Sequence, residues 1–100
     1  MTNINDSHVI ALPHAFSLSQ NYPNPFNPST TIKYDLPSPC RVNIEIYDIL
    51  GRRVMTLVDE EQVAGSHQAI WNASDKASGI YFYRIQAGEF VETKKMLLVR

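Results

Sequence analysis

The side chains that could carry out chemistry in this sequence are few and far apart. None of the spacings typical of zinc ligands occurs among the histidines and the single cysteine, which are His8, His14, His67 and Cys40. The acidic run 59–61 could chelate calcium, but the alternating oxygen ligands and central glycine of a calcium loop are missing. A solvated charge cluster is the simpler interpretation, and we expect neither a metal ion nor another cofactor.

Catalytic and phosphate-binding motifs are missing as well. No serine lies in a G-x-S-x-G turn, and no motif links Cys40 to a histidine. The glycines at positions 51, 65, 79 and 88 are isolated and cannot form a phosphate-binding loop. Nine basic against ten acidic residues give a net charge of -1, which provides no field to attract nucleic acid. We therefore expect the chain to be no enzyme, without a small-molecule substrate or a nucleic-acid partner.

Three aromatic side chains leave two interpretations open. Trp71, Tyr81 and Tyr83 could together form a platform on which a sugar ring stacks, as in a carbohydrate-binding module. Aromatic residues at alternating positions are more often part of a core. Trp71 resembles the buried tryptophan of immunoglobulin-like sandwiches, and Tyr81, close after Gly79, resembles their tyrosine corner.

The elements that must position these residues are short strands. One hundred residues favour a single core, and apolar residues alternate with polar ones between turn signals spaced as in an all-β sandwich. We predict about seven antiparallel strands: Ala15–Gln20, Thr31–Leu36, Arg41–Asp48, Arg53–Val58, a strand after Gly65 with His67, Ala69 and Trp71 on one face, Ile80–Gln86 and Phe90–Val99. In the sixth strand, Tyr81, Tyr83 and Ile85 are expected to face inward.

The segment 53–58 is ambiguous, because its apolar residues also fit a helical spacing. Strand is favoured for two reasons. Gly51 would destabilise a first helical turn, and the acidic run 59–61 would lie at the negative end of a helix dipole. The preceding segment, 48–52, is then a hairpin loop that contains a turn-forming aspartate and a glycine.

The beginning of the chain differs from the rest. Residues 1–13 are polar and unpatterned, end at Pro13 and are predicted to be a linker, with the folded domain at residues 14–100. The first residues lack the basic start and apolar run of a secretory signal peptide, and no apolar run in the sequence is long enough to span a membrane.

The stretch NYPNPFNPST, residues 21–30, can form neither a helix nor an ordinary strand. Its prolines remove backbone donors and favour extended neighbours, so we predict an extended, unpaired segment that carries the chain from one sheet to the other. Asn24 and Asn27 are expected to bond nearby amides, and Phe26 to anchor the segment in the core. A role in recognition could be added to this structural one.

An ordered series of motifs gives the strongest functional signal. The motifs resemble the type A C-terminal sorting domain of the type IX secretion system over about Phe16 to Arg100: LSQNYPNPFNPSTTIKYDLP, VNIEIYDILGRRVMTLVD, AGSHQAIWN, ASGIYFYRIQAGEF and TKKMLLVR. The resemblance implies an immunoglobulin-like β-sandwich of seven strands. It also implies these recognition residues: Pro23, Asn24, Pro25, Phe26, Gly51, Val54, Gly79, Tyr81, Lys94, Lys95, Met96, Leu97, Leu98 and Val99.

The resemblance further implies an address label for an upstream cargo domain joined through the linker. Such a protein passes through the periplasm, crosses the outer membrane by a translocon that reads the folded domain, and ends at the cell surface or secreted. A surface sortase then cuts ahead of the domain in many members. We expect a monomer. The alternative function is a fibronectin-like or carbohydrate-binding accessory module of a secreted enzyme.

The last strand suggests a mechanism of recognition. The run 96–99 is apolar on both faces, and a terminal strand often leaves one sheet edge open. A translocon component could add a strand there, with Lys94, Lys95 and Arg100 supplying positive charge. The alternative is that the run pairs within the sandwich and that the lysines are solvated and oppose aggregation.

Overall fold

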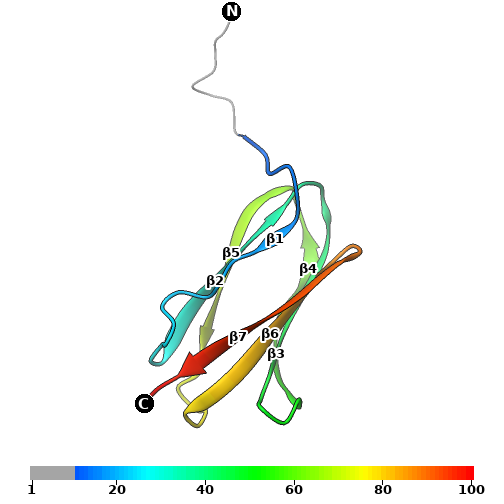
Figure 1. The fold of residues 1–100 in the computed structure, drawn as a ribbon. Helices are drawn as coiled ribbons and strands as arrows, with labels where there is room; N and C mark the ends of the chain where they lie inside the picture. Colours follow the sequence, from blue (N-terminus) through cyan, green and yellow to red (C-terminus); the bar gives the residue numbers. More distant parts are fainter. Residues whose placement is uncertain (1–10) are drawn as a thin grey trace, which may run out of the picture.

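The computed structural model describes residues 11–100, in which every regular element is a strand (Figure 1). No part of this range forms a helix that could cross a membrane. The strands are β1 (Ser17–Leu18), β2 (Ser29–Leu36), β3 (Cys40–Tyr47), β4 (Arg53–Gln62), β5 (Gly65–Asn72), β6 (Gly79–Ala87) and β7 (Phe90–Leu98). Predicted and observed strands agree in number and order.

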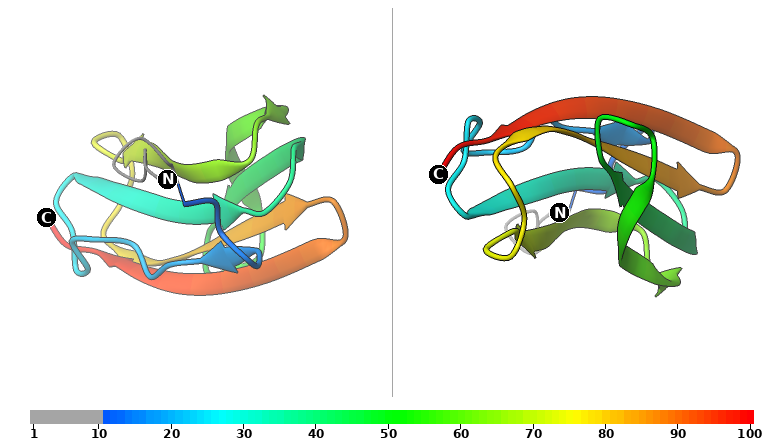
Figure 2. Two further views of the ribbon diagram at one scale, coloured as in Figure 1. Left: turned by 90° about the horizontal axis from the view of Figure 1, so that it is seen from above. Right: turned by 90° about the horizontal axis from the view of Figure 1, so that it is seen from below.

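The strands form two sheets that pack face to face (Figure 2). One sheet has the order β1-β2-β5, the other has the order β4-β3-β6-β7, and all paired strands are antiparallel. The fourth strand lies beside the third, whereas in constant-type immunoglobulin domains it lies beside the fifth. The two packed antiparallel sheets confirm the predicted all-β sandwich.

The core follows from the alternation of residue types along the strands. Side chains of β2 and β3 that face inward are 0 to 1% exposed, and they are Ile32, Tyr34, Leu36, Val42, Ile44 and Ile46. Each large apolar side chain buried in this way contributes about 1.5–3 kcal/mol. The inward set predicted for β6 is also buried, namely Tyr81, Tyr83 and Ile85.

The ambiguous segment after Gly51 is a strand, as predicted, and continues to Gln62. Among residues 11–100, β4 forms one edge of its sheet and pairs only with β3, with register shifts next to Glu45 and Tyr47. Few of its side chains reach the core, so its burial does not alternate regularly. This is why its sequence also fitted a helical spacing.

The three aromatic residues considered as a sugar platform are core residues. Trp71, Tyr81 and Tyr83 are 1%, 7% and 0% exposed, so they present no surface on which a sugar could stack. Trp71 packs edge-on against Tyr81, with ring centroids 5.3 Å apart. Trp71 lies on β5, however, and not on the third strand as in immunoglobulin domains.

The tyrosine corner predicted from the sequence is present. The Tyr81 hydroxyl donates a hydrogen bond of 2.7 Å to the carbonyl of Ala77, four residues upstream. This bond fixes the loop that leads into β6.

The two ends of the sandwich differ in which segments they carry. The ends of β5 and β7 and the starts of β2, β4 and β6 gather at the end where the C-terminus lies (Figure 1). We call this the C-terminal end, and its connecting segments are 21–28, 48–52, 73–78 and 99–100. The described chain enters near the opposite end, where β1 pairs with Tyr34 and Asp35 of β2.

Candidate recognition surface

The recognition residues implied by the sequence gather at the C-terminal end, with the exception of the two lysines. Pro23, Asn24, Pro25 and Phe26 lie in the segment between β1 and β2. Gly51 lies in the turn before β4, which contains the half-buried Val54. Gly79 begins β6 and pairs with Leu98 at the end of β7. Four separate stretches of sequence thus lie at the same end of the sandwich, with the turn before β4 and the end of β7 at opposite edges of the four-stranded sheet.

The segment 21–28, called here the Pro-Asn segment, is tied to the last strand. Phe26 is 1% exposed, and its ring lies 5.8 Å from that of Trp71, so it anchors the segment as predicted. Its backbone nitrogen donates to the carbonyl of Leu97, and its carbonyl accepts from the nitrogen of Val99, both at 3.0 Å. The side-chain oxygen of Asn24 accepts a 3.0 Å bond from the nitrogen of Leu97.

Three expectations for this segment were wrong. The segment is not unpaired, because it bridges to Thr31 through Tyr22 and to Leu98 through Phe26. It also joins β1 and β2 of the same sheet, although it reaches across to β7 of the other. Asn24 bonds a distant amide and not a nearby one. The partner groups come from the far end of the chain, which local sequence rules do not consider.

A buried polar network holds the start of the Pro-Asn segment. The Tyr83 hydroxyl accepts from the backbone nitrogen of Asn21 at 2.8 Å and donates to the carbonyl of Ser19 at 2.7 Å. The Asn21 amide donates to Thr30 Oγ1 at 2.9 Å and to the carbonyl of Pro23 at 3.1 Å. Burial raises the pKa of Tyr83 to about 12, so this hydroxyl stays protonated near neutral pH.

The last strand has one buried and one exposed face. Met96 and Leu98 are 1% and 0% exposed, while Leu97 and Val99 are 38% and 41% exposed. β7 is the outermost strand of its sheet, as expected for a terminal strand. Its outer edge at Leu97 and Val99 is nevertheless occupied by Asn24 and Phe26. The expectation of an open edge at residues 96–99 was therefore wrong.

Lys94 and Lys95 do not form one charge cluster. Successive residues of a strand point to opposite faces, and Lys94 lies on the same side as the buried Met96. Its ammonium group is 3.1 Å from a carboxylate oxygen of Glu92. Lys95 is exposed, and its carbonyl accepts a 2.7 Å hydrogen bond from the amide group of Gln20. The two lysines would meet different surroundings in any complex.

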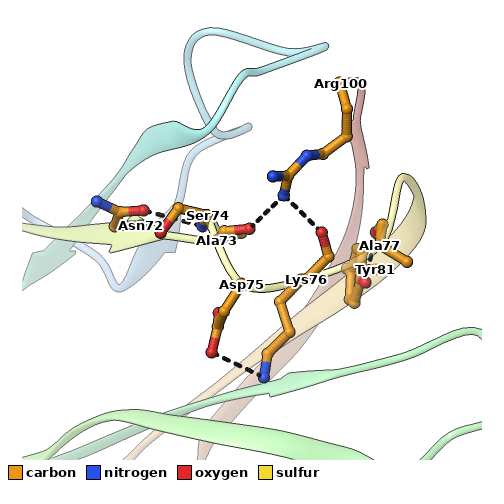
Figure 3. Close-up of polar contacts among 8 residues, drawn as sticks. All are labelled: Asn72, Ala73, Ser74, Asp75, Lys76, Ala77, Tyr81 and Arg100. Atoms are coloured by element: carbon orange, nitrogen blue, oxygen red, sulfur yellow. Dashed lines mark hydrogen bonds and ion pairs between the residues drawn. The ribbon is translucent and has the colours of Figure 1, made fainter.

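The C-terminal residue holds the loop between β5 and β6 (Figure 3). The guanidinium group of Arg100 donates to the carbonyls of Ala73 and Lys76 at 3.2 and 2.6 Å. Asn72 also stabilises this loop, because its side-chain oxygen accepts from the nitrogen of Ser74 at 2.9 Å. The end of the chain is thus part of the folded unit.

The turn 48–52 carries residues that the sequence did not identify as functional. Asp48 Oδ1 accepts from the nitrogens of Leu50 and Arg52 at 2.9 and 3.0 Å, and Oδ2 accepts from Arg52 Nε at 2.8 Å. These bonds lower the pKa of Asp48, and the bond from the Arg52 backbone amide has the largest effect. Gly51 adopts a φ of 82°, which other residues rarely adopt.

This turn exposes two aliphatic side chains, with Ile49 and Leu50 61% and 72% exposed. Turns are normally built from glycine, proline, asparagine, aspartate and serine. Two large apolar residues beside a turn-forming aspartate were therefore a signal available in the sequence.

The described residues considered for reactive chemistry do not lie at the C-terminal end, since Cys40 begins β3 at the opposite end of the sandwich. Within residues 11–100, no three histidine, cysteine, aspartate or glutamate side chains are grouped as a metal site requires. The pKa of the Cys40 thiol is raised, mainly by burial, which disfavours the reactive thiolate.

Comparison with known structures agrees with the fold. PorU from Porphyromonas gingivalis, in the crystal structure of its dimeric latent form, matches this fold with a TM-score of 0.65 and 22% sequence identity. The match covers 91% of this chain and 10% of the PorU chain. PorZ, an essential bacterial surface component of the type-IX secretion system of the same organism, matches with a TM-score of 0.53 and 24% sequence identity. That match covers 85% of this chain and 11% of the PorZ chain. This chain therefore spans about a tenth of each, and at these identities the likeness shows the fold.

A search of curated proteins returned no match. The family model described as a secretion system C-terminal sorting domain, in contrast, matches residues 20–99. That range contains every recognition residue implied by the sequence motifs. The chain therefore belongs to the family of C-terminal sorting domains of the type IX secretion system.

Proposed function

We propose that this domain directs an attached cargo protein across the outer membrane through the type IX secretion system, and that the machinery recognises it as a folded unit. A domain of this family marks a secreted or cell-surface protein. In the proposed route, the cargo first passes through the periplasm. The domain carries the address, and the upstream cargo carries the activity.

The observation that carries this proposal is the separation of the two ends of the sandwich. The described chain enters near one end, because β1 pairs beside the turn between β2 and β3. The Pro-Asn segment, the turn 48–52, the start of β6 and the end of β7 lie at the other (Figure 1). A cargo attached before residue 11 would leave the C-terminal end free for a receptor.

Recognition of a folded unit is supported by how this surface is assembled. Phe26 and Leu98, which are 72 positions apart in sequence, meet only when both sheets are packed. An unfolded tail would contain the same motifs without bringing them together. The proposed receptor therefore distinguishes a folded domain from a linear peptide.

In this proposal the last strand contributes to recognition through its side chains, and not by pairing with an added strand of the translocon. Its edge at Leu97 and Val99 is already bonded, so a receptor would contact side chains of the assembled end. Removing the final five residues would delete Met96 and Leu98 from the core. Loss of export in such a truncation would report unfolding as much as a lost contact.

Cleavage by a surface sortase belongs to the same proposal. We place the cut within residues 1–13, of which 1–10 lie outside the described range, because a linker ahead of the first strand gives a protease access. The domain would act as a monomer with the translocon and the sortase as its partners.

The test is to fuse the whole chain behind an exported fluorescent protein in a host that has the type IX system. We expect fluorescence at the cell surface or in the medium, and periplasmic fluorescence in a strain that lacks the translocon. Fluorescence that stays in the periplasm of the competent host would contradict the proposal. The carbohydrate-binding alternative has lost its supporting observation, because Trp71, Tyr81 and Tyr83 are buried.

A further inference from the structure

The turn 48–52 exposes apolar surface at the C-terminal end. We call the side chains of Ile49 and Leu50, 61% and 72% exposed, the apolar tip. Single exposed aliphatic residues are common. Two adjacent ones on a hairpin turn, however, leave a larger apolar surface in contact with water, and that surface does not stabilise the fold. A partner that covers them would remove this cost.

The apolar tip is held in one conformation. Asp48 accepts three hydrogen bonds from Leu50 and Arg52, and its own backbone bonds Gly51 and Arg52 at 2.9 Å. The positive φ of Gly51 closes the turn. Binding would therefore cost little conformational entropy, since the backbone that presents Ile49 and Leu50 is ordered beforehand.

The charge exposed around the tip is positive. In the pair Arg52–Asp48 the side chains are 72% and 17% exposed, and in the pair Arg53–Glu45 they are 61% and 15% exposed. The guanidinium groups therefore face solvent while their carboxylate partners are largely covered. A complementary surface would present carboxylates around an apolar pocket.

We propose that the apolar tip inserts into an apolar pocket, rimmed by carboxylates, on a folded protein of the sorting machinery. This inference rests on the proposed function, and it adds the contact by which the domain is recognised. A protein is favoured over an anionic membrane surface because the chain as a whole has a net charge of -1.

The variant that tests this is Ile49→Ser with Leu50→Ser in the fluorescent fusion to the whole chain. Both side chains are exposed, so the fold should persist, as circular dichroism and thermal unfolding of the purified chain will show. The matched control is Val63→Ser, which changes an equally exposed aliphatic residue, 70% exposed, in the turn between β4 and β5 at the opposite end. We expect at least a tenfold loss of exported fluorescence for the double variant and none for the control.

The outcomes separate this inference from the proposed function. If the unchanged fusion is not exported, the proposed function fails. If it is exported, and the folded double variant is exported equally well, the apolar tip is not the contact. Sedimentation of the chain with vesicles of phosphatidylglycerol tests the membrane instead, and tip-dependent binding there would overturn the protein pocket.

Discussion

The side-chain oxygen of Asn24 lies 3.0 Å from the backbone nitrogen of Leu97 and accepts its hydrogen bond. With the two backbone bonds of Phe26, it occupies the outer edge of the last strand. Open strand edges favour pairing with other chains, and proteins cover or interrupt them. The Pro-Asn segment thus protects an edge of the sandwich and shapes its C-terminal end.

Replacing Asn24 by alanine should remove one bond of this cover. We expect a loss of about 0.5–1.5 kcal/mol in the free energy of unfolding, and more self-association, because the Leu97 amide becomes available. Urea unfolding and light scattering measure the two effects. Asn27→Ala is the matched control, since Asn27 is exposed and makes no side-chain hydrogen bond in the described structure. Equal effects of the two substitutions would contradict the role given to Asn24.

Replacing Phe26 by alanine should destabilise the domain far more. The ring is 1% exposed and packs against Trp71, so its removal leaves a cavity and costs about 3–5 kcal/mol. Urea unfolding measures the change, and Tyr22→Ala, at a residue 80% exposed in the same segment, is the control. A loss below about 1 kcal/mol would show that the segment is not anchored through Phe26.

The Tyr83→Phe substitution tests the buried polar network. The ring stays, but the backbone nitrogen of Asn21 and the carbonyl of Ser19 lose their partner. Leaving buried groups unpaired should cost about 1–3 kcal/mol. Thermal unfolding gives the value, and Tyr22→Phe, which removes an exposed hydroxyl, should change little. An unchanged melting temperature in Tyr83→Phe would mean that other groups satisfy these atoms.

Alkaline pH should destabilise the domain through the same tyrosine. The pKa of Tyr83 is about 12 in the folded protein against 10.0 for an ordinary tyrosine. Between these values the unfolded chain has lost the proton that the folded chain keeps, so stability is complete below pH 10 and falls as pH rises towards 12. Urea unfolding at a series of pH values measures this. In Tyr83→Phe the decline should be smaller, with the remainder due to Tyr34, Tyr47 and the Cys40 thiol, whose pKa values are also raised.

Replacing Arg100 by alanine should loosen the loop between β5 and β6. The guanidinium group bonds the carbonyls of Ala73 and Lys76 at the surface, so we expect a loss of about 1 kcal/mol. Hydrogen exchange at residues 73–78 should become faster, while exchange in β3 should not. Arg100→Lys should recover only part of the protection. The ammonium group of lysine keeps the positive charge, but it lacks the guanidinium geometry that bonds both carbonyls. Unchanged exchange in the alanine variant would separate Arg100 from the loop.

Local patterns in the sequence were sufficient for the strands and their inward faces. The alternation of Ile32, Tyr34 and Leu36 required one buried face, and each is buried. The glycine and aspartate of the turn 48–52 marked a hairpin, which the structure has. The period of two could also have shown that Lys94 and Lys95 point to opposite faces.

By itself, then, the sequence determined the fold class, the order of strands and the family motifs, because these depend on neighbours a few residues apart. Only the tertiary structure decided that Asn24 and Phe26 cover the edge at Leu97, that β2 pairs with β5, and that the motifs share one end. The physical reason is that such pairings join residues far apart in the chain. These pairings stabilise the protein only when both sheets have packed, so they cannot be predicted from a local sequence pattern.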